Sequence, residues 1–173
     1  MLQKVESQSG RADPGATAQI ISFITGLDWN ELDASVRHAA KRHLLDTVGV
    51  MIAGAAGDLA NKTETVLARL RPAGGVPVPG RSRRADMLDS AYLGGAAAHG
   101  IELDDGYRQG SAHPGCAVVP AVLAAAYEGN ASGQDLLTAV VAGYEVMTAI
   151  SAAVHPQLRQ RPGTRRQAGH SDG

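Results

Sequence analysis

The chain has 173 residues, of which 44% are hydrophobic and 19% charged, so it is long enough for one globular domain with its own core. Its formal net charge of −1 gives no electrostatic case for nucleic-acid or membrane binding. A single cysteine, Cys116, excludes an internal disulfide framework and a cysteine-rich zinc site, and it fits a reducing, cytoplasmic compartment.

The first third of the chain predicts two helices after a polar lead-in. Residues 1–16 carry charges without an apolar stretch, which indicates a disordered lead-in rather than a secretory signal. Apolar residues at helical spacing predict a short helix over 17–27. A longer helix then begins after a cap at Asn30 or Asp33 and reaches about Ala53.

A third helix and a non-helical connector follow. The helix is predicted over residues 58–70, with its leucines and valine on one face. Residues 72–80 hold three prolines and three glycines, which forbids a helix and predicts a connector with a short extended piece. The longest apolar run, residues 48–56, is about half as long as a membrane span, so no transmembrane helix is predicted.

The fourth predicted helix consists almost entirely of small residues. It runs from Met87 to about Ile101 and is opened by Arg84 or Asp86. Its Ala and Gly side chains leave no bulk on the surface, so another helix must approach it very closely. Residues 102–115 then predict a polar loop.

Two further helices complete the predicted domain. One covers residues 117–127, with Pro120 in its first turn, where a missing N–H costs little. The other covers about 134–154 and is capped by Ser132.

Six helices joined by short loops predict an all-α, bundle-like domain over residues 17–154. The remaining residues, 155–173, contain four arginines and one bulky aliphatic side chain, which predicts a disordered polar tail.

The stretch from residue 99 to 113 carries most of the reactive side chains. Acids, bases and hydrogen-bonding groups gather there, directly after the small-residue helix, and loops on a rigid scaffold are where such groups meet a substrate. The candidate catalytic residues are Glu102, Asp104, Asp105 and His113. The candidate substrate-binding residues are His99, Tyr107, Arg108 and Ser111.

These residue types suit proton transfer on an anionic substrate. Repulsion among Glu102, Asp104 and Asp105 is expected to raise the pKa of at least one carboxyl, which makes it a general acid or base near neutral pH. His113 titrates in that range without any perturbation. Arg108 suits a substrate carboxylate, which it can hold through two parallel hydrogen bonds.

Structural roles compete with each of these interpretations. Asp104 and Asp105 can cap the loop or accept backbone N–H groups, and His113 can be a turn residue before Pro-Gly. The carboxylates can also hold Mg²⁺ or Ca²⁺ through oxygen, although the spacing of an EF-hand loop is absent. Asp46 and His43, in the second helix, are interpreted as structural or surface residues.

Four blocks of sequence, taken in order, resemble the MmgE/PrpD family. They are LLDTVGV around Asp46, AAHGIELDD around His99, HPG from His113 with a later Val-Pro-Ala at Pro120, and SGQDLL followed by GYEV from Ser132 onward. The resemblance covers residues 17–158.

The resemblance implies a fold and a chemistry. It implies an all-helical N-terminal domain followed by a smaller lid domain, a homodimer, and chemistry on small polycarboxylic acids without a cofactor or metal. In the family, proton abstraction next to a carboxylate leads to loss of water or CO₂, or to epimerisation. The positions that face the substrate correspond here to Glu102, Asp104, Asp105 and His113. Glu102 stands where many members have Asp, and Gly106 follows the Asp pair where many have Thr or His.

The family pattern stops after Leu158, where an arginine-rich run leads to the last residue. We therefore expect a truncated or frameshifted gene product that is weakly active or inactive. One alternative is a non-catalytic helical module that associates with a longer homologue through residues 94–98. Another is a metal-dependent hydrolase that uses the same three acids and His113.

Overall fold

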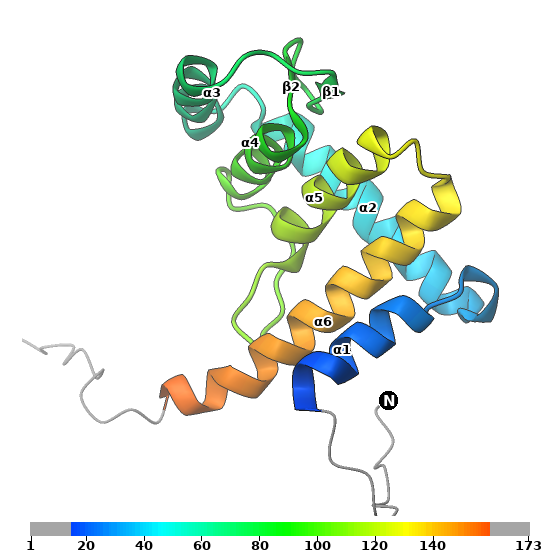
Figure 1. The fold of residues 1–173 in the computed structure, drawn as a ribbon. Helices are drawn as coiled ribbons and strands as arrows, with labels where there is room; N and C mark the ends of the chain where they lie inside the picture. Colours follow the sequence, from blue (N-terminus) through cyan, green and yellow to red (C-terminus); the bar gives the residue numbers. More distant parts are fainter. Residues whose placement is uncertain (1–14, 160–173) are drawn as a thin grey trace, which may run out of the picture.

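The computed structural model describes residues 15–159, with side chains described as far as His155 (Figure 1). Within this range the all-α prediction is confirmed: six α-helices dominate, and the only strands form a two-residue antiparallel pair. The elements are α1 Gly15–Gly26, the 3₁₀ turn η1 Trp29–Glu31, α2 Ala34–Gly54, α3 Asp58–Leu70, β1 Val76–Pro77, β2 Arg84–Ala85, α4 Met87–His99, α5 Pro114–Glu128 and α6 Gly133–Arg159.

Two predicted helix caps are confirmed in atomic detail. The Asp86 carboxylate accepts a hydrogen bond of 2.8 Å from the backbone N–H of Asp89 at the start of α4. Ser132 and Asp135 form a reciprocal pair before α6, because the Ser132 Oγ accepts from Asp135 N at 3.2 Å while Asp135 Oδ2 accepts from Ser132 N at 3.1 Å.

The start of α5 differs from the prediction. The helix begins at Pro114 rather than at residue 117, so Pro120 lies inside the helix and not in its first turn. Because Pro120 has no N–H, it leaves the Cys116 carbonyl without its usual helical donor. A Cβ placed on Gly95 of α4 would lie 2.8 Å from that carbonyl oxygen, so α4 approaches α5 closely at the place where the helical bond is missing.

The ends of the domain are also more helical than predicted. Residues 15 and 16 belong to α1, and α6 continues past residue 154 to Arg159. The disorder predicted for residues 1–14 and 160–173 falls outside the described residues.

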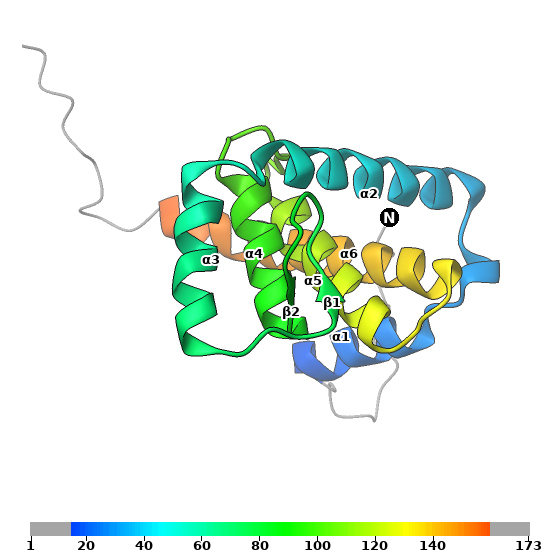
Figure 2. The same ribbon diagram turned by 90° about the horizontal axis from the view of Figure 1, so that it is seen from above.

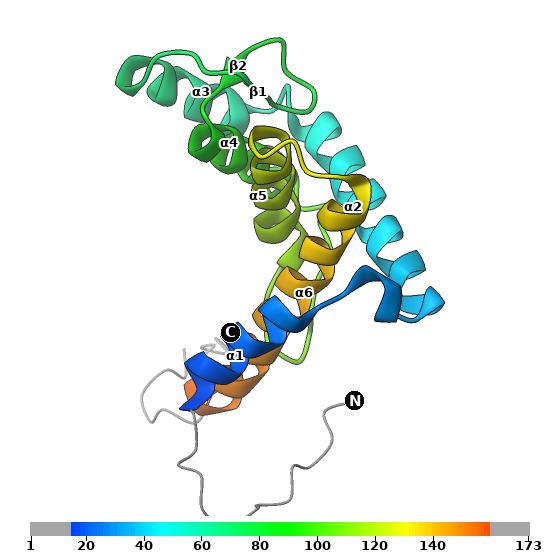
Figure 3. The ribbon, with the colours of Figure 1, turned by 45° about the vertical axis from the view of Figure 1, so that its right-hand side comes forward.

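Helices α2 and α5 connect two groups of elements. One group is α3, α4 and the β1–β2 pair, and the other is α1 and α6. Figure 2 shows α3 and α4 side by side with the β1–β2 pair near them, while α2 runs along the upper edge of the view. Helix α5 packs between α4 and α6, and α2 contacts all three. Figure 3 shows α1 lying along α6, away from α3 and α4.

The close packing predicted for the small-residue helix is confirmed within the chain. A Cβ on Gly94 would lie 2.6 Å from the Met51 Cε and 2.9 Å from the Pro120 Cβ, and Ala97 and Ala98 are fully buried. The buried members of residues 94–98 therefore pack against α2 and α5, while Gly95 and Ala96 are partly exposed. The expected association of this stretch with a second chain stays a prediction.

Helix α6 requires a correction to the membrane prediction. Residues 133–155 form a helix long and apolar enough to cross a membrane, although one such helix is weak evidence for a span. In this domain α6 packs against α5 and α2, and Val140 and Val141 are buried in the core between the helices. The outer face keeps Ile150 and Val154 about half exposed.

Candidate active site

The loop between α4 and α5 is held in one shape by backbone contacts. Its first turn places Glu102 in the left-handed region at φ 55°, with its N–H bonded to the His99 carbonyl. Further along, the Tyr107 N–H donates to the Ala112 carbonyl at 2.7 Å and closes the loop on itself. Gly110 lies so close to Ser151 of α6 that a Cβ there would overlap the serine side chain. The loop is thus anchored at its base and against α6.

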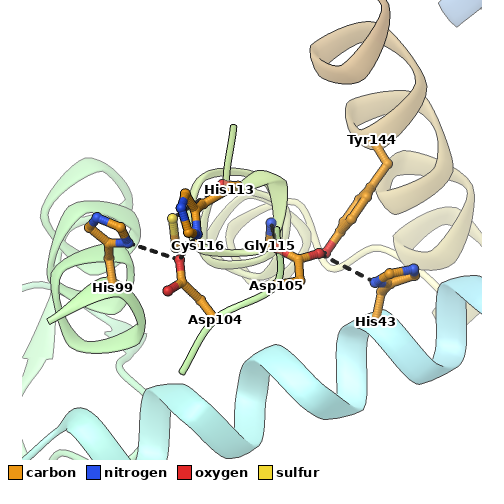
Figure 4. A network of polar contacts seen from close by, with 8 residues as sticks. All are labelled: His43, His99, Asp104, Asp105, His113, Gly115, Cys116 and Tyr144. Carbon is orange, nitrogen blue, oxygen red and sulfur yellow. Dashed lines mark hydrogen bonds and ion pairs between the residues drawn. The ribbon is translucent and has the colours of Figure 1, made fainter. Parts of the chain in front are cut away.

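A buried carboxylate joins two histidines at the centre of this loop. The Asp104 side chain is only 1% exposed, and its Oδ2 lies 2.9 Å from the Nδ1 of His99 and 3.3 Å from the Nδ1 of His113. The two imidazole rings stand edge to face with centroids 5.1 Å apart (Figure 4). Both histidines remain about half exposed, so the arrangement presents two imidazoles to solvent on one buried anion.

The electrostatics of this cluster differ from the prediction of a raised carboxyl pKa. Burial raises the pKa of Asp104, but the hydrogen bonds from His99 and Cys116 outweigh it, and the pKa lies below its ordinary value. The hydrogen bond and the charge of Asp104 in turn raise the pKa of His99. Asp104 is therefore an ionised partner of the histidines, and the repulsion among neighbouring acids does not decide its state.

The adjacent Asp105 faces the opposite direction and is fully engaged. Its Oδ1 accepts a 2.8 Å hydrogen bond from the Gly115 N–H, and its Oδ2 accepts a 2.9 Å bond from the Tyr144 hydroxyl. The Nδ1 of His43 lies 3.4 Å from the same Oδ2 (Figure 4). Asp105 thus caps the N-terminus of α5, which is the structural role that the sequence offered as an alternative for this residue. Its contacts with Tyr144 and His43 also link this end of α5 to α6 and α2.

Two of these partners were not identified from the sequence. The sequence predicts a structural or surface role for His43 and gives Tyr144 no role of its own, yet their rings lie 4.7 Å apart and both contact Asp105. Burial, followed by the hydrogen bond to Asp105, raises the pKa of Tyr144. The only local signal for Tyr144 is its place in the GYEV block, and no local signal marks His43.

The single cysteine lies beside the cluster but is not activated. The Cys116 Sγ donates to the His113 carbonyl at 3.2 Å. Burial and then the neighbouring Asp104 raise the pKa of the thiol to about 12. Because the thiolate is the nucleophile, Cys116 is unsuited to covalent catalysis.

The remaining predicted residues lie around the cluster without joining it. Glu102, Arg108 and Ser111 are exposed and Tyr107 is half-buried. Among residues 15–155, none of these four side chains makes a hydrogen bond or ion pair, although the charge of Glu102 contributes to the raised pKa of His99. The bidentate role expected of Arg108 concerns a substrate carboxylate and stays a prediction.

Two open hollows flank the loop. One, of about 530 Å³, is lined by His99, Cys116 and apolar side chains of α3, α4 and α5. The other, of about 510 Å³, lies beside Asp105 and is lined by Arg42, His43 and Asp46 among others. A larger hollow of about 640 Å³ between β1 and the α5–α6 turn is lined by neither a histidine nor a carboxylate. The two hollows beside the loop therefore contain site residues, whereas the larger one contains none of them.

Comparison with known proteins places this geometry in context. The family model described as MmgE/PrpD N-terminal domain matches residues 18–167. A cis-aconitate decarboxylase-like protein, oryM, from Aspergillus oryzae is 27% identical over 146 residues, which cover 80% of this chain and 30% of that protein. A cis-aconitate decarboxylase from Aspergillus terreus is 27% identical over 155 residues, which cover 87% of this chain and 32% of the relative. No solved structure matches the chain. The chain thus spans about a third of the length of the curated relatives it matches.

Proposed function

The chain belongs to the MmgE/PrpD family, and from this premise we propose that its helical domain carries the acid–base side of a site for small polycarboxylic acids. The reaction class is a dehydration, decarboxylation or epimerisation that begins with proton transfer next to a carboxylate. Two relatives, one named cis-aconitate decarboxylase and the other cis-aconitate decarboxylase-like, support the substrate class.

One observation carries the proposal: Asp104 is buried, while the two imidazoles bound to it are about half exposed. A neutral imidazole accepts a proton from carbon, and the resulting imidazolium is stabilised by the carboxylate at 2.9 or 3.3 Å. In a dehydration the same imidazolium returns the proton to the leaving hydroxyl. In an epimerisation the second imidazole, already protonated, delivers its proton to the opposite face of the carbon, and in a decarboxylation an already protonated imidazole donates its proton to the carbon that loses CO₂. His99 and His113 are the proposed proton carriers, and Asp104 stabilises their charged forms.

Asp105 is a positioning residue in this proposal. Its two oxygens hold the Gly115 N–H and the Tyr144 hydroxyl, which fixes the first turn of α5 directly after His113. Such support keeps an acid–base group within the narrow range of positions that proton transfer requires. The contacts of Asp105 with three elements support a role in orientation, and in this proposal the proton chemistry is left to the histidines.

We further propose that this chain binds a small polycarboxylic acid but converts it only slowly or not at all. The charge that develops on an enolate-like intermediate needs cationic or hydrogen-bonding partners. Among the described residues, Arg42 lines the hollow beside Asp105, while Arg108 is exposed and has no contact with the histidine cluster. Few cations therefore stand ready to stabilise the intermediate.

Calorimetric titration with cis-aconitate tests the proposal on the purified chain. We expect saturable binding that His113→Ala weakens at least tenfold, because the half-exposed imidazole is one of the two groups proposed to face the substrate. His38→Ala is the matched control, since His38 is an exposed histidine of α2 outside the cluster. Absence of binding by the unmodified chain, or an equal loss in both variants, would contradict the proposal.

A second candidate function is association with another chain of the family, either a second copy as a homodimer or a longer member. It is favoured by apolar side chains left exposed on α1 and α6, namely Ile21, Phe23, Ile24, Ile150 and Val154. Sedimentation velocity of the chain, alone and mixed with a longer family member, tests it. A monomer in both samples would contradict it, and dispersal of the complex by Ile24→Ser with Ile150→Ser would support it.

A further inference from the structure

We infer that His99, Asp104 and His113 form a binding site for a divalent transition-metal ion of the zinc class. This inference goes beyond the proposed function: a bound ion would occupy one imidazole nitrogen of His99 and of His113, so the proton transfer proposed above belongs to the metal-free chain.

The spacing of the ligand atoms fits such an ion. One ligand atom from each of the three residues lies within 4.8 Å of the other two. Asp104 Oδ2 is 2.9 Å from the His99 Nδ1 and 3.3 Å from the His113 Nδ1. In a tetrahedral zinc site with bonds of about 2.0–2.1 Å, ligand atoms lie about 3.4 Å apart. The two nitrogen–oxygen separations are therefore already within about half an ångström of that value.

The buried carboxylate of Asp104 is an independent reason to expect a bound cation. Asp104 is only 1% exposed, and its second oxygen, Oδ1, is buried without a hydrogen-bond partner in the described part of the chain. A buried anion that lacks partners is costly, and nearly all such groups are hydrogen-bonded, paired with a charge or bound to a metal. When both histidines are neutral, no described cation forms an ion pair with Asp104, and a divalent ion would compensate its charge directly.

The donor set selects the class of metal. Two imidazole nitrogens and one carboxylate oxygen suit Zn²⁺, Co²⁺, Fe²⁺ or Ni²⁺, whereas Mg²⁺ and Ca²⁺ prefer oxygen alone. This differs from the oxygen-only alternative considered for the acidic triad, because Glu102 is exposed and Asp105 is occupied by Gly115 and Tyr144. Three protein ligands leave a coordination position for water or a ligand, and the half-exposed histidines open it to solvent.

Direct metal titration tests the site without any substrate. The tag-free chain is treated with chelator, dialysed, and titrated with Zn²⁺ by calorimetry and with Co²⁺ by visible absorption. We expect one ion per chain. His99→Ala and His113→Ala should each weaken binding at least tenfold, since even outer-shell partners of a metal cost about 10–100-fold. Asp104→Asn should weaken it similarly, and His38→Ala should leave it unchanged.

The outcomes separate this site from the proposed function. Failure of the chain to bind one equivalent of Zn²⁺, or unchanged affinity in both His99→Ala and His113→Ala, would overturn the metal site. Circular dichroism identifies any variant that fails to fold, and the two exposed histidines keep the test valid if Asp104→Asn is such a variant. Cis-aconitate binding is measured separately in metal-free buffer, so either conclusion can fail while the other stands.

Discussion

Gly115 is the position where the packing of the site can be tested most sharply. It lies in the first turn of α5, and a Cβ there would lie 2.6 Å from the Thr47 Oγ1, 2.8 Å from the Asp105 Oδ1 and 2.9 Å from the Tyr144 hydroxyl. All three separations are shorter than real Cβ contacts, so Gly115→Ala must displace at least the Asp105 carboxylate. That carboxylate accepts the Gly115 N–H at 2.8 Å, and the displacement weakens this bond.

The expected cost follows from these contacts. Overpacking costs about 1–3 kcal/mol, and a hydrogen bond to a charged group contributes about 1.5–3 kcal/mol. Moving the Asp105 carboxylate relieves the overpacking but loses the hydrogen bond, so the two costs do not add fully. The better helix propensity of Ala returns up to about 1 kcal/mol. We therefore expect Gly115→Ala to lower the free energy of unfolding by about 2–4 kcal/mol.

Urea unfolding followed by circular dichroism measures this change. Gly133→Ala is the matched control, because Gly133 also lies in the first turn of a helix but a Cβ there meets nothing within 4 Å. The control should be neutral or slightly stabilising. If Gly115→Ala were as stable as Gly133→Ala, the close convergence of α2, α5, α6 and the loop on Gly115 would be refuted.

Three further predictions concern the charged and polar groups around the loop. Tyr144→Phe removes the hydroxyl bonded to Asp105, so it should lower the free energy of unfolding by about 1.5–3 kcal/mol. Ultraviolet titration of the unmodified chain should show one tyrosine of raised pKa that is missing from the variant. An unchanged titration curve would count against the contact. His99 should titrate above its ordinary pKa of 6.5 by nuclear magnetic resonance and return toward it in Asp104→Asn. The stability gained from this pair is present below pH 6.5 and lost as pH rises through the raised pKa of folded His99, so a wild-type advantage over Asp104→Asn that grows with pH would refute the pairing. Cys116 should react with a thiol reagent at pH 8 far more slowly in the native chain than in urea, since a pKa raised from 9.0 to about 12 lowers the thiolate fraction about a thousandfold; equal rates would show that the thiol is neither buried nor held.

Local sequence signals were enough to predict most of the fold. The bounds of α3 agree with the predicted residues 58–70, and Asp86 and Ser132 cap α4 and α6 as expected, because capping and periodicity depend on neighbours within a few residues. The start of α5 was predicted three residues too late. There the first turn of the helix is capped by a hydrogen bond from the Gly115 N–H to the Asp105 carboxylate in the preceding loop. The periodicity of a helix does not predict such a contact.

The sequence predicted which residues gather at the site, but not how their side chains are arranged. The crowding of polar residues after α4 identified His99, Asp104 and His113, which do converge. The sequence could not reveal that two adjacent aspartates face opposite ways, one toward the histidine pair and the other toward α2 and α6. Tyr144 lies 39 residues from its partner Asp105, and such a contact follows from the packing of whole helices rather than from any local pattern.

The most direct test of the acid–base site is the response of individual histidines to a polycarboxylate. In ¹H–¹⁵N spectra of the imidazole rings, titration with cis-aconitate should shift the resonances of His99 and His113 in a saturable manner, because these two half-exposed rings share the Asp104 carboxylate. His38, exposed on α2, should not respond. Unshifted His99 and His113 resonances, or equal shifts of all the histidines, would contradict the account.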